Sequence, residues 1–192
     1  MKKALIVIDI QAEYFPGGKV PLHEPEAAAK NAAWLLAECR EQGVAIVHVR
    51  HTMPVERGVP FLLEGTPGHE IHPSVRPVTN EAVISKRFPN AFRETNLLAT
   101  LRALEVNQLI LCGMMTHMCV DFSAKEAFDL GFAVTVVGDA TATCALPFGD
   151  TVIPADVVRD ANLAALHGIV ANVVTTKQAV NELRGGAAAR AS

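Results

Sequence analysis

Short apolar runs alternate along this chain with longer segments that carry apolar residues at helical spacing, and this alternation limits the fold most strongly. The first run, residues 4–8, is continuously apolar and ends at Asp9, which is typical of a strand buried on both faces. Further strands are predicted at residues 44–49, 82–85, 109–111, 132–137 and 169–174, and helices at residues 26–42, 97–104, 120–130, 154–167 and 175–183. This order favours an α/β fold of three layers, α-β-α, in which helices cover both faces of a Rossmann-like, six-stranded parallel sheet.

Length and charge limit the number of domains and the kind of partner. With 192 residues the chain can form one large core, so we expect a single domain over residues 1–184 and a disordered tail over residues 185–192. The formal net charge of -3 is spread without runs, which argues against a nucleic acid or an anionic membrane as partner. We see neither a membrane-spanning apolar stretch nor a signal-peptide pattern. The four cysteines follow no metal-ligand spacing, so we expect reduced thiols and a cytoplasmic protein.

Residues 109–130 predict a buried strand, a tight turn and a helix, with a cysteine where the helix begins. Gly113 suits the turn, and Thr116 suits the N-cap of the helix. Cys119 would then lie in the first helical turn, where the helix dipole lowers the pKa of a thiol. We therefore consider Cys119 a candidate nucleophile. The alternative is a small core residue at a strand–helix junction.

Three reactive side chains are expected at the same edge of the sheet. Asp9 follows the first strand, Lys86 the third, and Cys119 the fourth. In open parallel sheets the carboxyl ends of the strands meet in a crevice where the strand order reverses. There the lysine cation would stabilise the carboxylate and a thiolate, while the carboxylate accepts the thiol proton. Taken singly, the aspartate is commonly a turn residue and the lysine a solvated charge.

An ordered set of short motifs resembles the isochorismatase-like cysteine hydrolases, the superfamily of nicotinamidases and N-carbamoylsarcosine amidase. The motifs are Asp9-Ile10-Gln11 with Phe15, Ser85-Lys86 with Asn90-Ala91-Phe92 and Thr95, Gly113 to Val120, and Gly138-Asp139-Ala140. The resemblance implies an Asp9–Lys86–Cys119 catalytic triad and a cis peptide bond at Met114–Met115. It also implies an oxyanion hole from the N–H groups of Met115 and Cys119, and assembly as a homodimer or homotetramer.

Departures from the family pattern narrow the expected chemistry. Nicotinamidases carry an Asp-x-His metal pair after the second strand, whereas Arg50 stands here where that aspartate is expected. His51, His69 and His72 are therefore expected to be polar loop residues, some of them lining the pocket, with a metal site as the alternative. We expect no cofactor. The isochorismate-cleaving members lack the nucleophilic cysteine, so Cys119 favours hydrolysis of a small-molecule amide or another C–N bond through a thioester.

Residues near the triad in sequence are candidates for binding the small-molecule substrate. They are Gln11, Phe15, Phe88, Phe92, Thr116 and His117, for each of which ordinary packing is the alternative. The proline-containing segment of residues 50–81 lacks periodicity, which is typical of a loop that serves a site. Two other functions remain open from the sequence: a non-catalytic or redox-sensing protein on the same scaffold, and a vinyl-ether hydrolase of the isochorismatase type.

Overall fold

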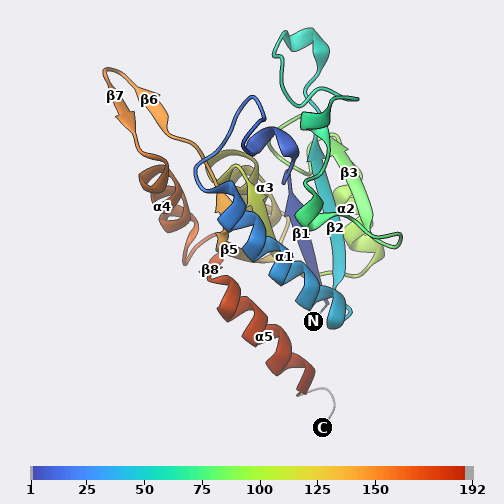
Figure 1. Ribbon diagram of the computed structural model, residues 1–192. Helices are drawn as coiled ribbons and strands as arrows, with labels where there is room; N and C mark the ends of the chain where they lie inside the picture. The colour runs from blue at the N-terminus through green and yellow to red at the C-terminus, as the bar shows by residue number, and fades with distance from the viewer. Residues whose placement is uncertain (1, 189–192) are drawn as a thin grey trace.

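The computed structural model describes residues 2–188 and contains one parallel sheet of six strands (Figure 1). Along the sheet the strand order is β3-β2-β1-β4-β5-β8, and every neighbouring pair is parallel. The strands are β1 (Lys3–Ile8), β2 (Ala45–His51), β3 (Ala82–Lys86), β4 (Gln108–Met114), β5 (Ala133–Ala142) and β8 (Asn172–Val174). A two-stranded antiparallel hairpin, β6 (Leu146–Phe148) with β7 (Thr151–Ile153), extends beyond the sheet. The expected three-layer α/β architecture is therefore confirmed.

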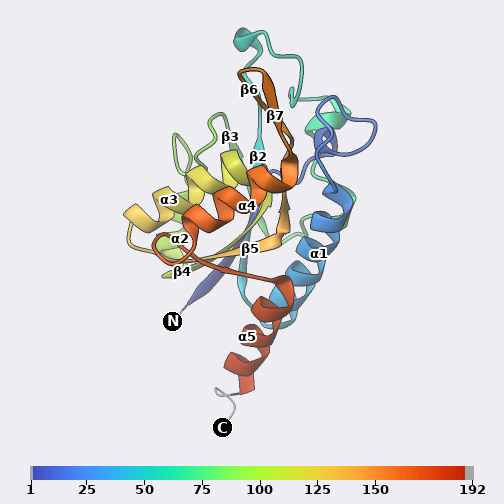
Figure 2. The ribbon, with the colours of Figure 1, turned by 90° about the vertical axis from the view of Figure 1, so that its left-hand side faces the viewer.

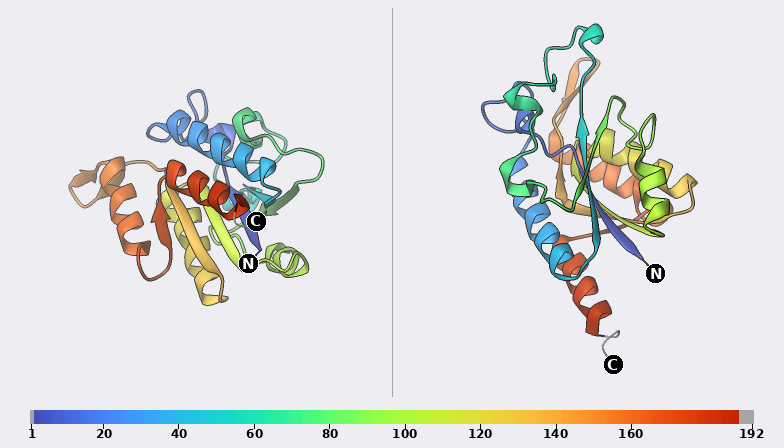
Figure 3. Two further views of the ribbon diagram at one scale, coloured as in Figure 1. Left: turned by 90° about the horizontal axis from the view of Figure 1, so that it is seen from below. Right: turned by 90° about the vertical axis from the view of Figure 1, so that its right-hand side faces the viewer.

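Five helices cover the two faces of the sheet: α1 (Pro25–Glu41), α2 (Leu97–Ala103), α3 (Asp121–Asp129), α4 (Ala155–Leu166) and α5 (Thr176–Ala188). α1 and α5 contribute buried residues such as Leu35 and Val180 to the core on one face. α2, α3 and α4 contribute Leu101, Ala124 and Leu166 to the core on the other face. Figures 2 and 3 show these two groups of helices on opposite sides of the sheet.

The central strand β1 shows why the sequence folds in this way. Its side chains alternate between the two faces: Leu5 and Val7 enter the core beneath α1, while Ile6 and Ile8 enter the core beneath α3. All four are at most 2% exposed. Because both faces are covered, no position between Ala4 and Ile8 is left for a polar side chain.

β1 and β4 lie side by side where the strand order reverses, and Gly113 permits their close approach. Gly113 has a φ of +132°, and a Cβ built on it would lie 1.9 Å from the carbonyl oxygen of Ile8. Only glycine fits there. We expected Gly113 in a turn after the strand, but it lies within β4, which continues to Met114.

Several predicted boundaries need correction. β4 and β5 are longer than predicted because they pair again beyond an irregularity, Gly113 with Thr141 and Met114 with Ala142. The last strand is shorter than predicted because Gly168 and Ala171 close a turn before it. α5 continues to Ala188, so the chain is helical beyond Gly185, where we expected disorder to begin; residues 189–192 of that segment lie outside the described part of the chain. Among the described residues, no helix is long and apolar enough to cross a membrane.

Candidate active site

Asp9 lies directly after β1, at the point where the strand order reverses. Its φ is +49°, in the left-handed region, which aspartate tolerates better than most residues. Its N–H donates a hydrogen bond to the carbonyl of Val49 at the end of β2, at 2.9 Å. The residue is completely buried. The turn thus places the carboxylate at the carboxyl edge of the sheet, as the sequence predicts.

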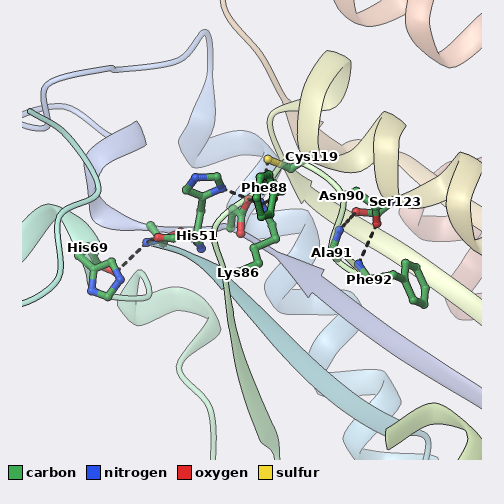
Figure 4. Close-up of polar contacts among 11 residues, drawn as sticks. His51, His69, Lys86, Phe88, Asn90, Ala91, Phe92, Cys119 and Ser123 are labelled. Atoms are coloured by element: carbon green, nitrogen blue, oxygen red, sulfur yellow. Dashed lines mark hydrogen bonds and ion pairs between the residues drawn. The ribbon is translucent and has the colours of Figure 1, made fainter. Parts of the chain in front are cut away.

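Lys86 is the last residue of β3, which is separated from β1 by β2. Its side chain extends past the end of β2 to reach Asp9. Its Nζ lies 2.7 Å from Oδ2 of Asp9 and 3.1 Å from Sγ of Cys119. Both charged side chains have no exposed surface. Figure 4 shows Lys86 and Cys119 pointing toward one another from β3 and from the turn before α3. The three groups that the sequence places at strand ends therefore meet.

Cys119 lies in a single π-helical turn, Thr116–Val120, that joins β4 to α3. It is only 4% exposed. Burial and the Asp9 carboxylate raise the pKa of the Cys119 thiol to about 12, and the opposite effect of Lys86 does not compensate. The expectation of a lowered pKa is therefore wrong, because desolvation next to a carboxylate outweighs the helix terminus. The Cys119 thiol is therefore neutral at physiological pH.

Lys86 carries a positive charge, and Asp9 keeps a carboxylate oxygen that has no hydrogen-bond partner. Burial lowers the pKa of Lys86, but the adjacent Asp9 and Cys119 more than offset that effect and raise the pKa. Lys86 is thus an ammonium at neutral pH. Neither carboxylate oxygen of Asp9 accepts a hydrogen bond from the described residues; Oδ2 makes the ion pair with Lys86, and Oδ1 is buried without a partner. This oxygen is free to accept a proton from the thiol or from water.

The peptide bond between Met114 and Met115 is cis, as the family resemblance implies. The carbonyl of Met115 accepts hydrogen bonds from the N–H groups of Met118 and Val120, which fixes the π-helical turn. The N–H of Met115 donates to no acceptor among the described residues. An oxyanion hole built from the N–H groups of Met115 and Cys119 stays a prediction.

His51, His69 and His72, which we expected in the loop, do not form a common metal site. His51 contacts Lys86 through Nδ1 at 2.9 Å, His69 contacts the hydroxyl of Thr52 at 2.8 Å, and His72 caps the turn at Ser74. Within the described chain, the one group of potential metal ligands is Asp9, His51 and Cys119. All three contact Nζ of Lys86, so the cation that they surround is the ammonium itself.

Gln11 and Phe15 lie close to the triad but have partners within the protein. The amide of Gln11 donates to the carbonyls of His51 and His69 and accepts from the N–H of His51. It thereby fixes the end of β2 against the loop. Phe15 is 5% exposed and stacks on the ring of His72, with 3.8 Å between the ring centroids.

The two other phenylalanines lie in different surroundings. The carbonyl of Phe88 accepts a hydrogen bond from Nζ of Lys86 at 3.1 Å, and the guanidinium groups of Arg57 and Arg93 lie over its ring. Phe92 points away from the triad in Figure 4 and packs near Phe132 in the core under α2 and α3. Phe88 is thus the member of the pair that adjoins the reactive groups.

Thr116 and His117 begin the π-helical turn, and each is bound to β5 or to the residue after it. The Thr116 hydroxyl is buried and donates to the hydroxyl of Thr141, so it does not act as the expected N-cap; Met115 takes the N-cap position. Nδ1 of His117 is hydrogen-bonded to the hydroxyl of Thr143. These contacts fix the π-helical turn to the neighbouring strand. Contact of either residue with a substrate remains untested.

The sequence does not predict that Tyr14 lies near Asp9 and Cys119, or that His51 contacts Lys86 directly. Tyr14 is 2% exposed, and burial together with the nearby Asp9, Cys119 and Cys144 raises its pKa. It is therefore a neutral phenol beside the triad. The signal was its position five residues after Asp9, in the 3-10 turn Ala12–Tyr14 that three residues separate from β1, but spacing alone does not give the direction of its side chain.

A six-stranded parallel sheet with a buried aspartate, lysine and cysteine at its switch point is the arrangement that the sequence resemblance to isochorismatase-like hydrolases implies. The family model of the isochorismatase domain matches residues 3–178, and the chain belongs to this family. The Bacillus subtilis protein YddQ of the same family is 46% identical over 178 residues, which cover 92% of this chain and 98% of the relative. The maleamate amidohydrolase of Pseudomonas putida is 32% identical over 95% of this chain and 87% of its own length.

Solved structures show the same fold. An isochorismatase from Pseudomonas putida superimposes with a TM-score of 0.86 at 38% identity, covering 92% of this chain and 89% of that one. A cysteine hydrolase from Pseudomonas syringae gives a TM-score of 0.90 at 22% identity, over 96% of this chain and 93% of that one. The latter likeness concerns the fold alone.

Proposed function

We propose that this protein hydrolyses a small-molecule amide, or another C–N bond, through a thioester on Cys119. The observation that carries the proposal is the contact of one buried ammonium with both a carboxylate and a thiol: Lys86 Nζ lies 2.7 Å from Asp9 Oδ2 and 3.1 Å from Cys119 Sγ. A neutral thiol needs a base before it can attack, and the unpartnered oxygen of Asp9 is the base at hand.

Acylation begins when Sγ of Cys119 attacks the carbonyl carbon of the amide. Asp9 accepts the thiol proton, and the developing oxyanion is stabilised by backbone N–H groups, for which the unpaired N–H of Met115 is a candidate. The C–N bond then breaks, and Asp9 returns the proton to the leaving ammonia or amine. The product of this half-reaction is a thioester.

Deacylation uses the same carboxylate in the opposite sense. Asp9 removes a proton from water as the water attacks the thioester carbonyl, and the proton then passes to the sulfur that leaves. Lys86 holds the carboxylate in position throughout and offsets its charge, because a buried charge without a partner is costly.

The relatives support an amide as the bond that is cut. Their names include maleamate amidohydrolase of Pseudomonas putida and nicotinamidase of Escherichia coli, each of which denotes hydrolysis of an amide. Streptothricin hydrolase of Streptomyces noursei is 35% identical over 76% of this chain. None of these substrates is assigned to the present chain.

The test is ammonia or amine release from a panel of small amides, ureido acids and carbamoyl compounds. We expect turnover of at least one compound, a thioester detectable by intact-protein mass spectrometry, and loss of both in Cys119→Ala. If no compound is turned over while Cys119 is oxidised rapidly and reversibly, the protein is a redox sensor and the proposal fails. The burial of Cys119 and its raised pKa favour the hydrolase.

We also propose that the protein forms a homo-oligomer through the β6–β7 hairpin and α4. Phe148, Val152 and Val157 on these elements are 76%, 67% and 50% exposed, and the hairpin extends away from the sheet in Figure 1. A second copy would cover these apolar side chains. Light scattering should give a dimer or tetramer, and Phe148→Glu should shift it toward the monomer; a monomeric wild-type protein would contradict this proposal.

A further inference from the structure

The Lys86 ammonium has more acceptors than hydrogens. Four acceptor atoms surround Nζ: Oδ2 of Asp9 at 2.7 Å, Nδ1 of His51 at 2.9 Å, the carbonyl oxygen of Phe88 at 3.1 Å and Sγ of Cys119 at 3.1 Å. An ammonium carries three hydrogens. Nδ1 of His51, the Phe88 carbonyl and Sγ of Cys119 accept hydrogen bonds from these hydrogens, whereas Oδ2 of Asp9 makes an ion pair with Nζ and is the acceptor that receives no hydrogen bond.

His51 is built to be one of these acceptors. Burial, reinforced by the Lys86 cation, lowers the pKa of His51 to about 4, so the ring is neutral at physiological pH. Because Nδ1 accepts from Lys86, the hydrogen of the neutral ring is on Nε2. Nε2 is buried and has no partner among the described residues. The contact with Lys86 is thus the hydrogen bond that orients this imidazole.

The backbone fixes the ring at this place. β2 lies between β1 and β3 in the sheet, and His51 is directly opposite Lys86 in the β2–β3 register. The amide of Gln11 holds both the N–H and the carbonyl of His51, at 2.8 and 3.0 Å. Strand pairing and Gln11 together therefore present Nδ1 to the ammonium.

We propose that His51 is a positioning residue that keeps the Lys86 ammonium beside Asp9 while Cys119 is acylated. This inference rests on the proposed function. When Sγ forms its bond to the acyl carbon, the thiol proton leaves through Asp9 with the amine, and the sulfur becomes a weak acceptor. The N–H of Lys86 that pointed at sulfur then turns toward Oδ2 of Asp9, while Nδ1 of His51 and the carbonyl of Phe88 keep the other two N–H groups. When water releases the acid product and the thiol reforms, that N–H returns to sulfur.

The test separates acylation from deacylation with p-nitrophenyl acetate, which acylates thiols without the natural substrate. Sγ attacks the ester, the thiol proton passes through Asp9 to solvent, and p-nitrophenolate leaves; water then hydrolyses the acetyl thioester to acetate and free thiol. Stopped-flow absorbance gives the acylation rate constant, and the decay of the acetylated mass gives the deacylation rate constant. His51→Leu removes the acceptor, whereas His51→Asn keeps an acceptor near the position of Nδ1. His48→Leu, in the same strand and bound to Glu81 instead, is the matched control for loss of a buried histidine.

We expect His51→Leu to slow deacylation by roughly tenfold to a hundredfold, the cost typical of a misplaced catalytic group, and to slow acylation much less. His51→Asn should recover most of the deacylation rate, and His48→Leu should change neither rate constant. Equal losses in His51→Leu and His51→Asn, or deacylation unchanged in His51→Leu, would overturn the role of His51 while leaving the thioester mechanism intact. A wild-type protein that forms no acetyl-Cys119 would overturn the proposed function and the role of His51 with it.

Discussion

Nζ of Lys86 lies 2.7 Å from Oδ2 of Asp9, and neither side chain is exposed to solvent. Removing one partner of such a pair leaves an uncompensated buried charge, which typically costs about 3–5 kcal/mol. Lys86→Met should therefore lower the free energy of unfolding by about that amount and abolish amide hydrolysis. Urea unfolding followed by circular dichroism measures the first effect, and ammonia release the second.

The double variant Asp9→Asn/Lys86→Met is the control for this prediction. It removes both charges, so its stability should return most of the way to the wild-type value while activity stays absent. A double variant as unstable as Lys86→Met would show that the ammonium stabilises the fold through its other contacts rather than by neutralising Asp9.

The raised pKa of Cys119 makes its reactivity depend on pH. Because burial and Asp9 hold that pKa at about 12, the thiolate fraction rises about tenfold for each pH unit between about 7 and 10. The rate of alkylation of Cys119 by iodoacetamide should rise in parallel, without a plateau in that range. Peptide mass spectrometry identifies the labelled cysteine, and Cys144→Ser removes the background from the more exposed thiol.

Asp9→Asn should accelerate this labelling although it abolishes catalysis. The substitution removes an anion that raises the pKa of Cys119 and leaves the Lys86 cation that lowers it. The labelling rate at neutral pH should therefore rise above that of the wild-type protein. Slower labelling in Asp9→Asn would mean that Asp9 activates the resting thiol as well as accepting its proton during the reaction.

The sequence predicts that Asp9, Lys86 and Cys119 lie close together, but it does not predict the pKa of Cys119. Strand ends in a parallel sheet share one edge, so the positions of Asp9, Lys86 and Cys119 follow from element order alone. The pKa of Cys119 does not follow from element order, because it depends on desolvation and on the distance to Asp9 in the packed site. A helix terminus alone would lower this pKa, but burial and Asp9 raise it.

The sequence does not predict the direction in which a side chain points, and several expected contacts depend on that direction. Phe88 and Phe92 are four residues apart, yet one adjoins Lys86 and the other packs near Phe132. Similarly, Ala127 is completely buried, whereas its neighbour Phe128 on the same helix is 44% exposed. In an irregular segment after a strand, sequence spacing does not tell which way a side chain points. The predicted second strand also ended too early: β2 continues to His51, which we expected in the following loop.

Glu81 makes the stability of the protein depend on pH in the acid range. Burial alone would raise the pKa of Glu81, but hydrogen bonds from Arg40, the N–H of Val78 and His48 lower it to about 2, from a value of 4.5 when unfolded. A lowered folded-state pKa contributes stability above the unfolded value that is lost as pH falls toward the folded one. The midpoint of urea unfolding should therefore fall between about pH 4.5 and pH 2.

Glu81→Gln is the variant that isolates this contribution. It removes the carboxylate but keeps the size of the side chain, and it should cost about 1–3 kcal/mol at neutral pH, as expected for hydrogen bonds to a charged group. Its stability should also change less than that of the wild-type protein between about pH 4.5 and pH 2. An acid dependence identical to wild type would assign the effect to other carboxylates.

Gly113 should be the least replaceable glycine of the sheet. A Cβ at this position would lie 1.9 Å from the carbonyl oxygen of Ile8, and the φ of +132° is outside the range of alanine. Gly113→Ala must therefore push β4 away from β1, at the point where Asp9 and the π-helical turn begin. Overpacking of this kind costs about 1–3 kcal/mol in a core, and the backbone strain adds to it.

Gly149 offers a matched comparison, because it has a φ of +57° but a Cβ added there would meet no atom within 4 Å beyond its chain neighbours. Gly149→Ala should cost only about 1–2 kcal/mol from backbone strain and leave amide hydrolysis unchanged. Gly113→Ala should lose more stability than Gly149→Ala and should also lose activity in the fraction that remains folded, since β1 and β4 position Asp9 and Cys119. Equal stability and activity in the two variants would show that β1 and β4 separate without disturbing the site.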